Sequence, residues 1–248
     1  MKKHYPELLL MLSILAIISI CFSIYLARFF NNQQVEAARI AEETALKKKK
    51  KEAPKKTYEE TVNDKIEAGD FPNRMKVPLI LQTDGLWKDQ FYGEEGDEPL
   101  QNTLAINGCA IVSLAMVYSY LENEYKTPMD ILSWSGNRYF SKETGTAWHI
   151  FNDFAAANKY EFEDLGDQLP LVKEQLKQNH PVIVSVKPGY FTDVGHVMVL
   201  TGYNEKENTF WLNNPSDTKE KGDTGRAFTE EEIQKESLHY WTMYKKKG

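Results

Sequence analysis

One cysteine of this 248-residue chain stands where nucleophilic chemistry is favoured. Cys109 follows Asn107-Gly108 and directly precedes Ala110–Leu121, an apolar run with helical periodicity and no Gly or Pro. At a helix N-terminus, unpaired backbone N–H groups and the positive end of the helix dipole favour the thiolate, which is the nucleophilic form of cysteine. The alternative is a small apolar core residue, the commonest role of a free cysteine.

A histidine and an asparagine supply what a thiol nucleophile needs. Gly195-His196 opens a predicted strand eighty-seven residues after Cys109, and a histidine there can reach a helix N-terminus and take the thiol proton. The next predicted strand ends at Asn213-Asn214-Pro215, where an amide can hold the second imidazole nitrogen and fix its tautomer. Taken singly, the histidine also suits a half-buried structural role, and Asn-Asn-Pro also suits a turn.

The elements that must position these residues are predicted in the order helices first, strands afterwards. Ala110–Leu121 is a buried helix, Thr127-Pro128 begins another, and Tyr203–Asn208 joins two strands as a hairpin. This order predicts an α+β fold and not a doubly wound parallel sheet. Further helices are predicted over Thr146–Asn158 and Leu171–Asn179, and strands over Val77–Leu81, Val182–Val186, His196–Thr201, Phe210–Leu212 and Tyr240–Tyr244.

Further segments before and between these three positions take part in the same pattern along the chain. They are Val77–Gln82 with Gly85-Leu86-Trp87 and Tyr92-Gly93, Ser113–Val117, Gly145–Trp148 and Lys187–Thr192. Together with Cys109, His196 and Asn214, they resemble the C39-like papain-fold cysteine peptidases, in particular their free-standing branch on Gram-positive surfaces. The resemblance covers roughly residues 75–244. It implies a papain-like fold with the nucleophile on a helix N-terminus in a helical half, followed by an antiparallel sheet.

The resemblance also implies a role for each reactive residue. Cys109 would be the nucleophile, His196 the general base and later the general acid, and Asn214 the residue that orients the imidazole. The family usually has Asp at the position of Asn214. The amide fills the same orienting role, but it removes a charge that stabilises the imidazolium.

Acyl transfer further needs hydrogen-bond donors aimed at the developing oxyanion, here the Cys109 backbone N–H and a side-chain amide. The resemblance suggests Gln82 for that amide, while Gln90 and Gln101 are nearer in sequence and remain alternatives. The sequence contains no HExxH motif and no paired CxxC, which argues against a zinc peptidase. Neither a metal nor a cofactor is expected.

Charge and cysteine content exclude two other classes of protein. Residues 1–60 hold 11 Lys/Arg and 7 Asp/Glu, a net +4, and the remainder holds 19 and 29, a net −10, which together give −6. An acidic folded part argues against nucleic-acid binding, which depends on clustered basic residues. Two cysteines are too few for a disulfide-rich scaffold.

The N-terminus carries a candidate membrane span. Leu8–Ala27 is a run of twenty residues without a charge, long enough to cross the hydrocarbon core as a helix. Lys2 and Lys3 precede it, so the positive-inside rule places the C-terminal part outside the cytoplasm. The alternative is a cleaved signal peptide. The predicted organisation is an anchor over residues 1–30, a charged stalk over 31–70 and a peptidase domain over 71–248.

These observations predict a single-pass, membrane-anchored, extracytoplasmic cysteine peptidase. It would cleave a peptide or isopeptide bond of a peptide or protein substrate through a thioester acyl-enzyme. Two alternatives remain: a peptidoglycan amidopeptidase with the same chemistry, and a catalytically silent module that binds a peptide in the same groove.

Overall fold

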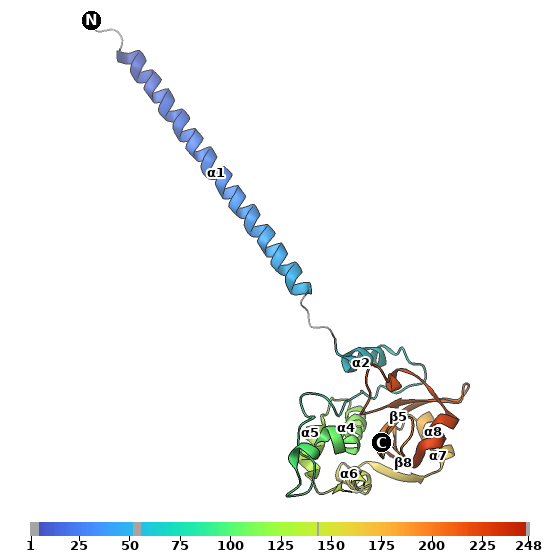
Figure 1. Ribbon diagram of the computed structural model, residues 1–248. Coiled ribbons are helices and arrows are strands. Elements are labelled where there is room, and N and C mark those ends of the chain that lie inside the picture. The colour runs from blue at the N-terminus through green and yellow to red at the C-terminus, as the bar shows by residue number, and fades with distance from the viewer. Residues whose placement is uncertain (1–4, 52–55, 143, 247–248) are drawn as a thin grey trace. The chain divides into compact units, whose positions relative to one another are not determined.

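The computed structural model describes residues 5–51, 56–142 and 144–246. The chain divides into two compact units, Met1–Lys55 and Lys56–Gly248. The first unit contains α1 (Tyr5–Lys51), one continuous helix (Figure 1). The predicted span Leu8–Ala27 lies within α1, and the side chains of its residues 8, 9, 12–14, 16 and 21 lie outside the described ones. Among the residues that are described, no helix is both long and apolar enough to cross a membrane. The anchor stays a prediction.

The second unit begins before the predicted domain boundary at residue 71. Helix α2 (Tyr58–Ala68) lies in the segment that the sequence suggested as a stalk. It starts with a capping box, in which the Thr57 side chain accepts from the Glu60 N–H and the Glu60 carboxylate accepts from the Thr57 N–H. Val62 and Ile66 are buried in the core, so residues 56–70 belong to the folded unit.

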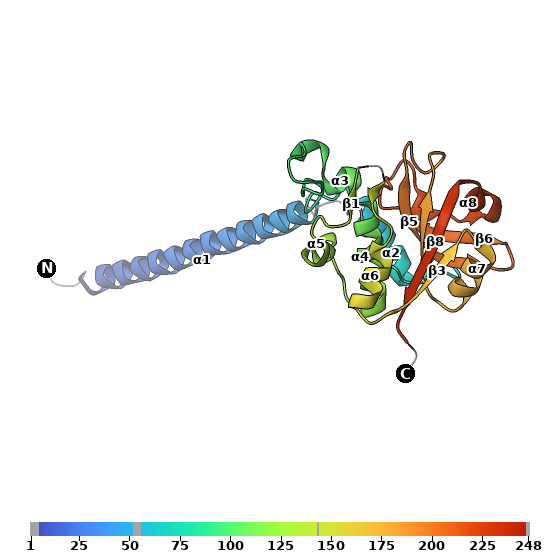
Figure 2. The same ribbon diagram turned by 90° about the horizontal axis from the view of Figure 1, so that it is seen from below.

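A six-stranded antiparallel sheet forms the C-terminal half of this unit, in the order β3-β8-β4-β5-β6-β7. Its strands are β3 (Glu161–Gly166), β4 (Val182–Val186), β5 (His196–Asn204), β6 (Thr209–Asn213), β7 (Phe228–Thr229) and β8 (Ser237–Tyr244). The helices α4 (Cys109–Glu122), α5 (Pro128–Ser135) and α6 (Ile150–Ala157) lie to one side of the sheet, and α7 (Leu169–Lys177) and α8 (Glu230–Glu236) lie to the other (Figures 1 and 2). The predicted α+β class with an antiparallel sheet is confirmed.

Short elements connect these layers. They are η1 (Pro99–Gln101), α3 (Leu104–Asn107), the two-stranded pair β1 (Phe140–Ser141) and β2 (Gly145–Thr146), and η2 (Asp223–Gly225). The helix predicted over Thr146–Asn158 therefore begins only at Ile150, because Gly145 and Thr146 pair as a strand with β1.

Helix α4 is the centre of the helical half. Its residues from Ala110 to Val117 are all buried, which agrees with the predicted buried helix. Its C-cap residue is Asn123, whose φ of 52° is the left-handed conformation that asparagine tolerates at a helix C-terminus. One side of α4 packs against β5. Near the start of both elements, the Ser113 hydroxyl donates to the Val197 carbonyl.

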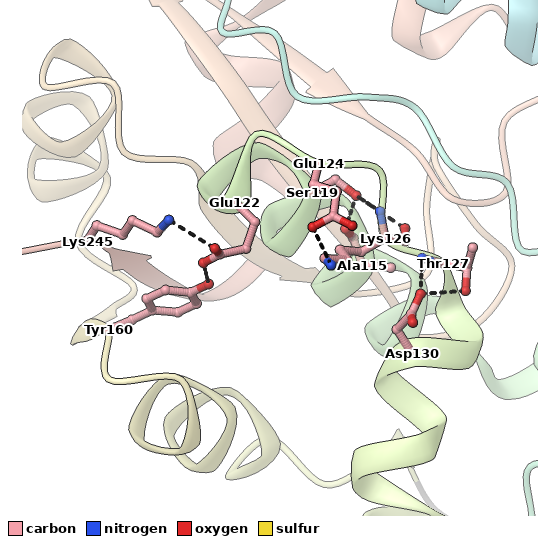
Figure 3. Close-up of polar contacts among 9 residues, drawn as sticks. All are labelled: Ala115, Ser119, Glu122, Glu124, Lys126, Thr127, Asp130, Tyr160 and Lys245. Carbon is pink, nitrogen blue, oxygen red and sulfur yellow. Dashed lines mark hydrogen bonds and ion pairs between the residues drawn. The ribbon is translucent and has the colours of Figure 1, made fainter.

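Polar side chains secure the C-terminal end of α4 (Figure 3). The Lys126 N–H donates to the Ser119 hydroxyl at 2.8 Å, which fixes the turn toward α5. Glu122 accepts from the Tyr160 hydroxyl and from the Lys245 ammonium, the latter at 3.1 Å. These two partners flank β3 and β8, so this cluster joins α4 to the distal edge of the sheet.

The strand predicted over Val77–Leu81 is wrong: the segment forms no strand. Its backbone groups are satisfied by side chains, because the Asn213 amide donates to the carbonyls of Val77 and Pro78, and Asn63 pairs with both the N–H and the carbonyl of Leu79. Pro78 lacks the N–H that a sheet ladder requires. The apolar residues that suggested a strand are nevertheless buried in the core.

Candidate active site

The turn from α3 into α4 delivers Cys109 to a helix N-terminus. Cys109 is the first residue of α4, and Gly108 precedes it at the cap position. A Cβ at Gly108 would lie 2.5 Å from the Leu104 carbonyl oxygen, so only glycine fits this close turn. Cys109 forms no disulfide with any described residue. The sequence thus predicted the position of the thiol correctly.

Opposing effects act on the pKa of the thiol. Cys109 is half-buried. Burial raises the pKa of Cys109 to about 11 and outweighs the hydrogen bonds from the backbone N–H groups of Val197, Ala110 and Cys109 itself, which lower it. Desolvation therefore opposes the thiolate that the helix N-terminus is expected to favour.

His196 begins β5 at the place where this strand meets α4. The carbonyl of Val197, the next residue, accepts from the Ser113 hydroxyl of α4 at 3.3 Å. Burial lowers the pKa of His196 to about 4, and the hydrogen bond with Asn214 opposes this only in part. At neutral pH the imidazole is therefore uncharged and can accept a proton.

Asn214 holds one nitrogen of that imidazole. Strands β5 and β6 pair antiparallel, with Val199 opposite Asn213, so the end of β6 returns to the beginning of β5. The Asn214 Oδ1 atom lies 2.8 Å from His196 Nε2. Because an amide oxygen only accepts, Nε2 carries the hydrogen, and Nδ1 is the nitrogen with a lone pair for a thiol proton.

The two neighbouring asparagines have different surroundings. Asn213 is the last residue of β6, and its amide donates to the carbonyls of Val77 and Pro78 while its oxygen accepts from Arg74. Asn213 therefore holds the segment before Gln82, whereas Asn214 holds His196. Of the tandem pair, it is Asn214 that contacts His196.

Gln82 lies beside the turn that carries Cys109. Its side chain is buried and donates from Nε2 to the Ala105 carbonyl at 2.6 Å, and its backbone N–H donates to the Pro215 carbonyl at 2.9 Å. It thus contacts both α3 and the residue after Asn214. The alternatives Gln90 and Gln101 are exposed, which favours Gln82 as the amide near the reactive atoms.

Two buried carboxylates behind Asn214 were missed by the sequence reasoning. The Asn214 Nδ2 atom donates to Asp223 Oδ2 at 2.8 Å. Asp217 in turn accepts the backbone N–H of Asp223 at 3.1 Å and that of Thr224 at 2.7 Å. Both acids lie in a Gly- and Lys-containing segment after Asn214 that resembles any polar turn, and no spacing rule singles them out.

Three tryptophans of the folded unit have structural contacts. Trp87 is buried and donates to the Leu81 carbonyl, and Trp134 stacks on Tyr139. Trp148 is 38% exposed and packs on Trp241.

Within the described part of the chain, no group of three His, Cys, Asp or Glu side chains is placed to hold a metal ion.

The comparisons with known proteins give one family. The Peptidase_C39 like family model matches residues 75–248. Among solved structures, a putative C39-like peptidase from Bacillus anthracis is 13% identical and aligns over 72% of this chain and 100% of its own, with a TM-score of 0.43. The peptidase domain of Streptococcus ComA, a bi-functional ABC transporter involved in a quorum sensing pathway, is 17% identical over 56% of this chain and 91% of its own, also with a TM-score of 0.43.

No curated protein matches the chain. The family match nevertheless covers well over half of the 248 residues and includes all the elements that carry Cys109, His196 and Asn214. The chain therefore belongs to the C39-like peptidase family and is a papain-like cysteine peptidase.

Proposed function

We propose that the peptidase hydrolyses a peptide or isopeptide bond with Cys109 as nucleophile, His196 as base and acid, and Asn214 as the residue that orients the imidazole. The observation that carries the proposal is the 2.8 Å contact between His196 Nε2 and Asn214 Oδ1 at the start of β5, the strand that contacts the helix beginning with Cys109. This contact leaves Nδ1 as the base.

The pKa directions favour a neutral thiol and a neutral imidazole in the resting site. As Sγ of Cys109 attacks the carbonyl carbon, its proton passes to Nδ1 of His196, so the two opposite charges form together next to each other. The backbone N–H of Cys109 and the Gln82 amide stabilise the oxyanion. The imidazolium then gives its proton to the leaving amine as the C–N bond breaks.

A water molecule completes the cycle. It attacks the thioester carbonyl while His196 accepts one of its protons, and the C–S bond breaks. The imidazolium returns the proton to the sulfur, and the carboxylic acid product leaves. The substrate of the proposed reaction is a peptide or isopeptide bond of a peptide or protein.

Covalent labelling tests this proposal on the full chain. The background variant Cys21→Ser leaves Cys109 as the only thiol. A peptidyl acyloxymethyl ketone, which needs an assembled thiol–imidazole site to react, should add once, as measured by intact mass. His196→Ala should abolish the addition, whereas His149→Ala, a change at an exposed histidine, should not. Equal labelling of the His196→Ala variant would overturn the proposal.

A catalytically silent peptide-binding module is the second candidate, because the group that contacts His196 is the uncharged amide of Asn214 and not a carboxylate. The two candidates differ in the effect of Cys109→Ser. The peptidase loses its function when the sulfur is replaced, while a binding module keeps its phenotype as long as the variant folds.

We also propose that the enzyme is anchored in the membrane with the peptidase unit outside the cytoplasm. The support is the uncharged run Leu8–Ala27 behind Lys2 and Lys3. Carbonate extraction of membranes from expressing cells tests the anchor. Full-length protein in the membrane pellet supports it, and a shortened chain in the medium instead identifies a cleaved signal peptide. Protease treatment of intact cells tests the orientation, because only an external domain is degraded.

A further inference from the structure

We propose that Asp223 is a positioning residue of the peptidase that acts on His196 through Asn214. The inference rests on the proposed triad and extends it by one residue. Its basis is a continuous path of contacts: Asp223 Oδ2 accepts from Asn214 Nδ2 at 2.8 Å, and Asn214 Oδ1 contacts His196 Nε2 at 2.8 Å. All three side chains are buried.

The chemistry of the carboxylate decides how the amide is oriented. An amide has a donor end and an acceptor end, and either can face a neighbour, but an ionised carboxylate only accepts. Asp223 therefore requires the NH₂ group of Asn214 to face it, which turns Oδ1 toward His196. The Ser216 N–H donates to the same Oδ1 at 2.9 Å and acts in the same sense. The hydrogen of His196 is then held on Nε2.

The position of Asp223 is itself fixed. Asp217 accepts the backbone N–H groups of Asp223 and Thr224, and its Oδ2 accepts the Tyr58 hydroxyl at 2.8 Å. The Thr224 hydroxyl accepts the Asn214 N–H at 3.3 Å. Thus α2, which precedes the family match, supports the loop that holds the carboxylate.

Two buried carboxylates in one loop oppose folding unless they make specific contacts. Burial raises the pKa of Asp223, the nearby Asp217 raises it further, and the Asn214 amide opposes both effects. The neutral Ser216 N–H favours the same orientation of Asn214, but more weakly than a carboxylate does. A carboxylate at position 223 makes a stronger hydrogen bond to Asn214 than a neutral acceptor would, and it can only accept. This accounts for an acid at this buried position.

This relationship predicts that the acid and the amide can exchange places. In the double variant Asn214→Asp/Asp223→Asn, the new carboxylate at 214 accepts from His196 Nε2, from the Ser216 N–H and from the new amide at 223. Each hydrogen bond of the native network has a counterpart. In Asp223→Asn alone, two amides face each other, and both orientations of Asn214 become available. In Asn214→Asp alone, two carboxylates face each other and repel.

A double-mutant cycle tests the inference on the full chain in the Cys21→Ser background. The first readout is the rate constant for labelling of Cys109 by the acyloxymethyl ketone. We expect a loss of at least about tenfold for each single variant. In Asp223→Asn, the hydrogen of the base can move to the wrong nitrogen. In Asn214→Asp, the repulsion between two facing carboxylates displaces the group that holds the imidazole. The double variant should return to within about threefold of the parent, as expected for two directly coupled sites.

The second readout is the tautomer of His196, followed by ¹⁵N NMR of histidine-labelled protein and assigned with His196→Ala. The parent and the double variant should show hydrogen on Nε2 alone, whereas Asp223→Asn should show both tautomers. Tyr58→Phe is the matched control. It weakens the same loop without touching Asn214, so it should lower the Tm and leave the tautomer unchanged.

The outcomes separate two failures. If the parent and His196→Ala label at the same rate, the proposed triad itself is wrong. If these two differ but Asp223→Asn labels like the parent, only the positioning role of Asp223 is wrong. A double variant that shows the product of the two single losses also overturns it, because a merely structural acid is not rescued by a new acid at position 214.

Discussion

Ser113 and Val197 join the two halves of the site: the Ser113 hydroxyl, one turn after Cys109 in α4, donates at 3.3 Å to the carbonyl of Val197, the residue after His196 in β5. The strand thus meets the helix within its first two turns. Because His196 precedes Val197 directly, the strand that contacts α4 also carries the imidazole. The elements that carry the thiol and the imidazole are therefore joined by a direct helix–strand contact.

The buried neutral imidazole makes stability depend on pH. The pKa of His196 falls from 6.5 to about 4 on folding, so between these values the unfolded chain binds a proton that the folded chain does not. Stability is therefore lost as the pH falls through this window, by roughly 3 kcal/mol in total. Urea unfolding at a series of pH values measures it.

The control for that measurement is His196→Gln, which removes the titrating group but keeps a buried polar side chain. The unfolding free energy of the parent should fall relative to that of the variant as the pH is lowered, and the fall should level off near the folded pKa of His196. Parallel pH profiles for the two proteins would contradict the lowered pKa of His196.

The thiol provides an independent test of the resting charge state. Since burial raises the pKa of Cys109 from 9.0 to about 11, iodoacetamide should modify the native Cys21→Ser protein slowly at neutral pH, with a midpoint near the raised value. The same protein unfolded in urea should show a midpoint near the ordinary one. Fast modification of the native protein at acid pH would instead demonstrate a thiolate–imidazolium pair, and would contradict a neutral resting site.

The sequence predicted the central parts of the fold because they are encoded locally. The apolar periodicity of Ala110–Leu121 and the β-branched run of Val182–Val186 correspond to α4 and β4. Strand β3 was missed, because its sequence Glu161–Gly166 is largely acidic and it forms a strand only through pairing with β8. Val77–Leu81 has the opposite character: its apolar residues are buried, but side chains satisfy its backbone.

For the site, the order of Cys109, His196 and Asn214 was visible in the sequence, but the surroundings of the thiol were not. The helix dipole is a local property, whereas desolvation depends on what the whole fold packs around the sulfur. The same applies to Asp223, whose contact with Asn214 arises from a loop closed by Asp217 and Tyr58.

Helix α2 should contribute measurably to the stability of the peptidase unit. Asn63 donates to the Leu79 carbonyl at 2.9 Å and accepts the Leu79 N–H at 2.7 Å, and Leu79 is fully buried. Asn63→Ala leaves both backbone groups without these partners, so it should lower the unfolding free energy by about 1–3 kcal/mol. Lys65→Ala, at an exposed position of the same helix, should have little effect. Equal urea midpoints for the two variants would show that α2 is not part of the cooperative unit.

Gln82 should affect the reaction more than the fold. If its amide stabilises the oxyanion, Gln82→Ala should lower the rate of acyloxymethyl ketone labelling of Cys109 by about 10²- to 10³-fold, the usual effect of losing one such donor. The exposed Gln90→Ala and Gln101→Ala variants should react like the parent. Because Gln82 also donates to the Ala105 carbonyl, its variant should have a lower Tm, and labelling is compared well below that temperature. A folded Gln82→Ala protein that labels at the parent rate would exclude this residue from the oxyanion site and leave the Cys109 backbone N–H as the remaining candidate donor.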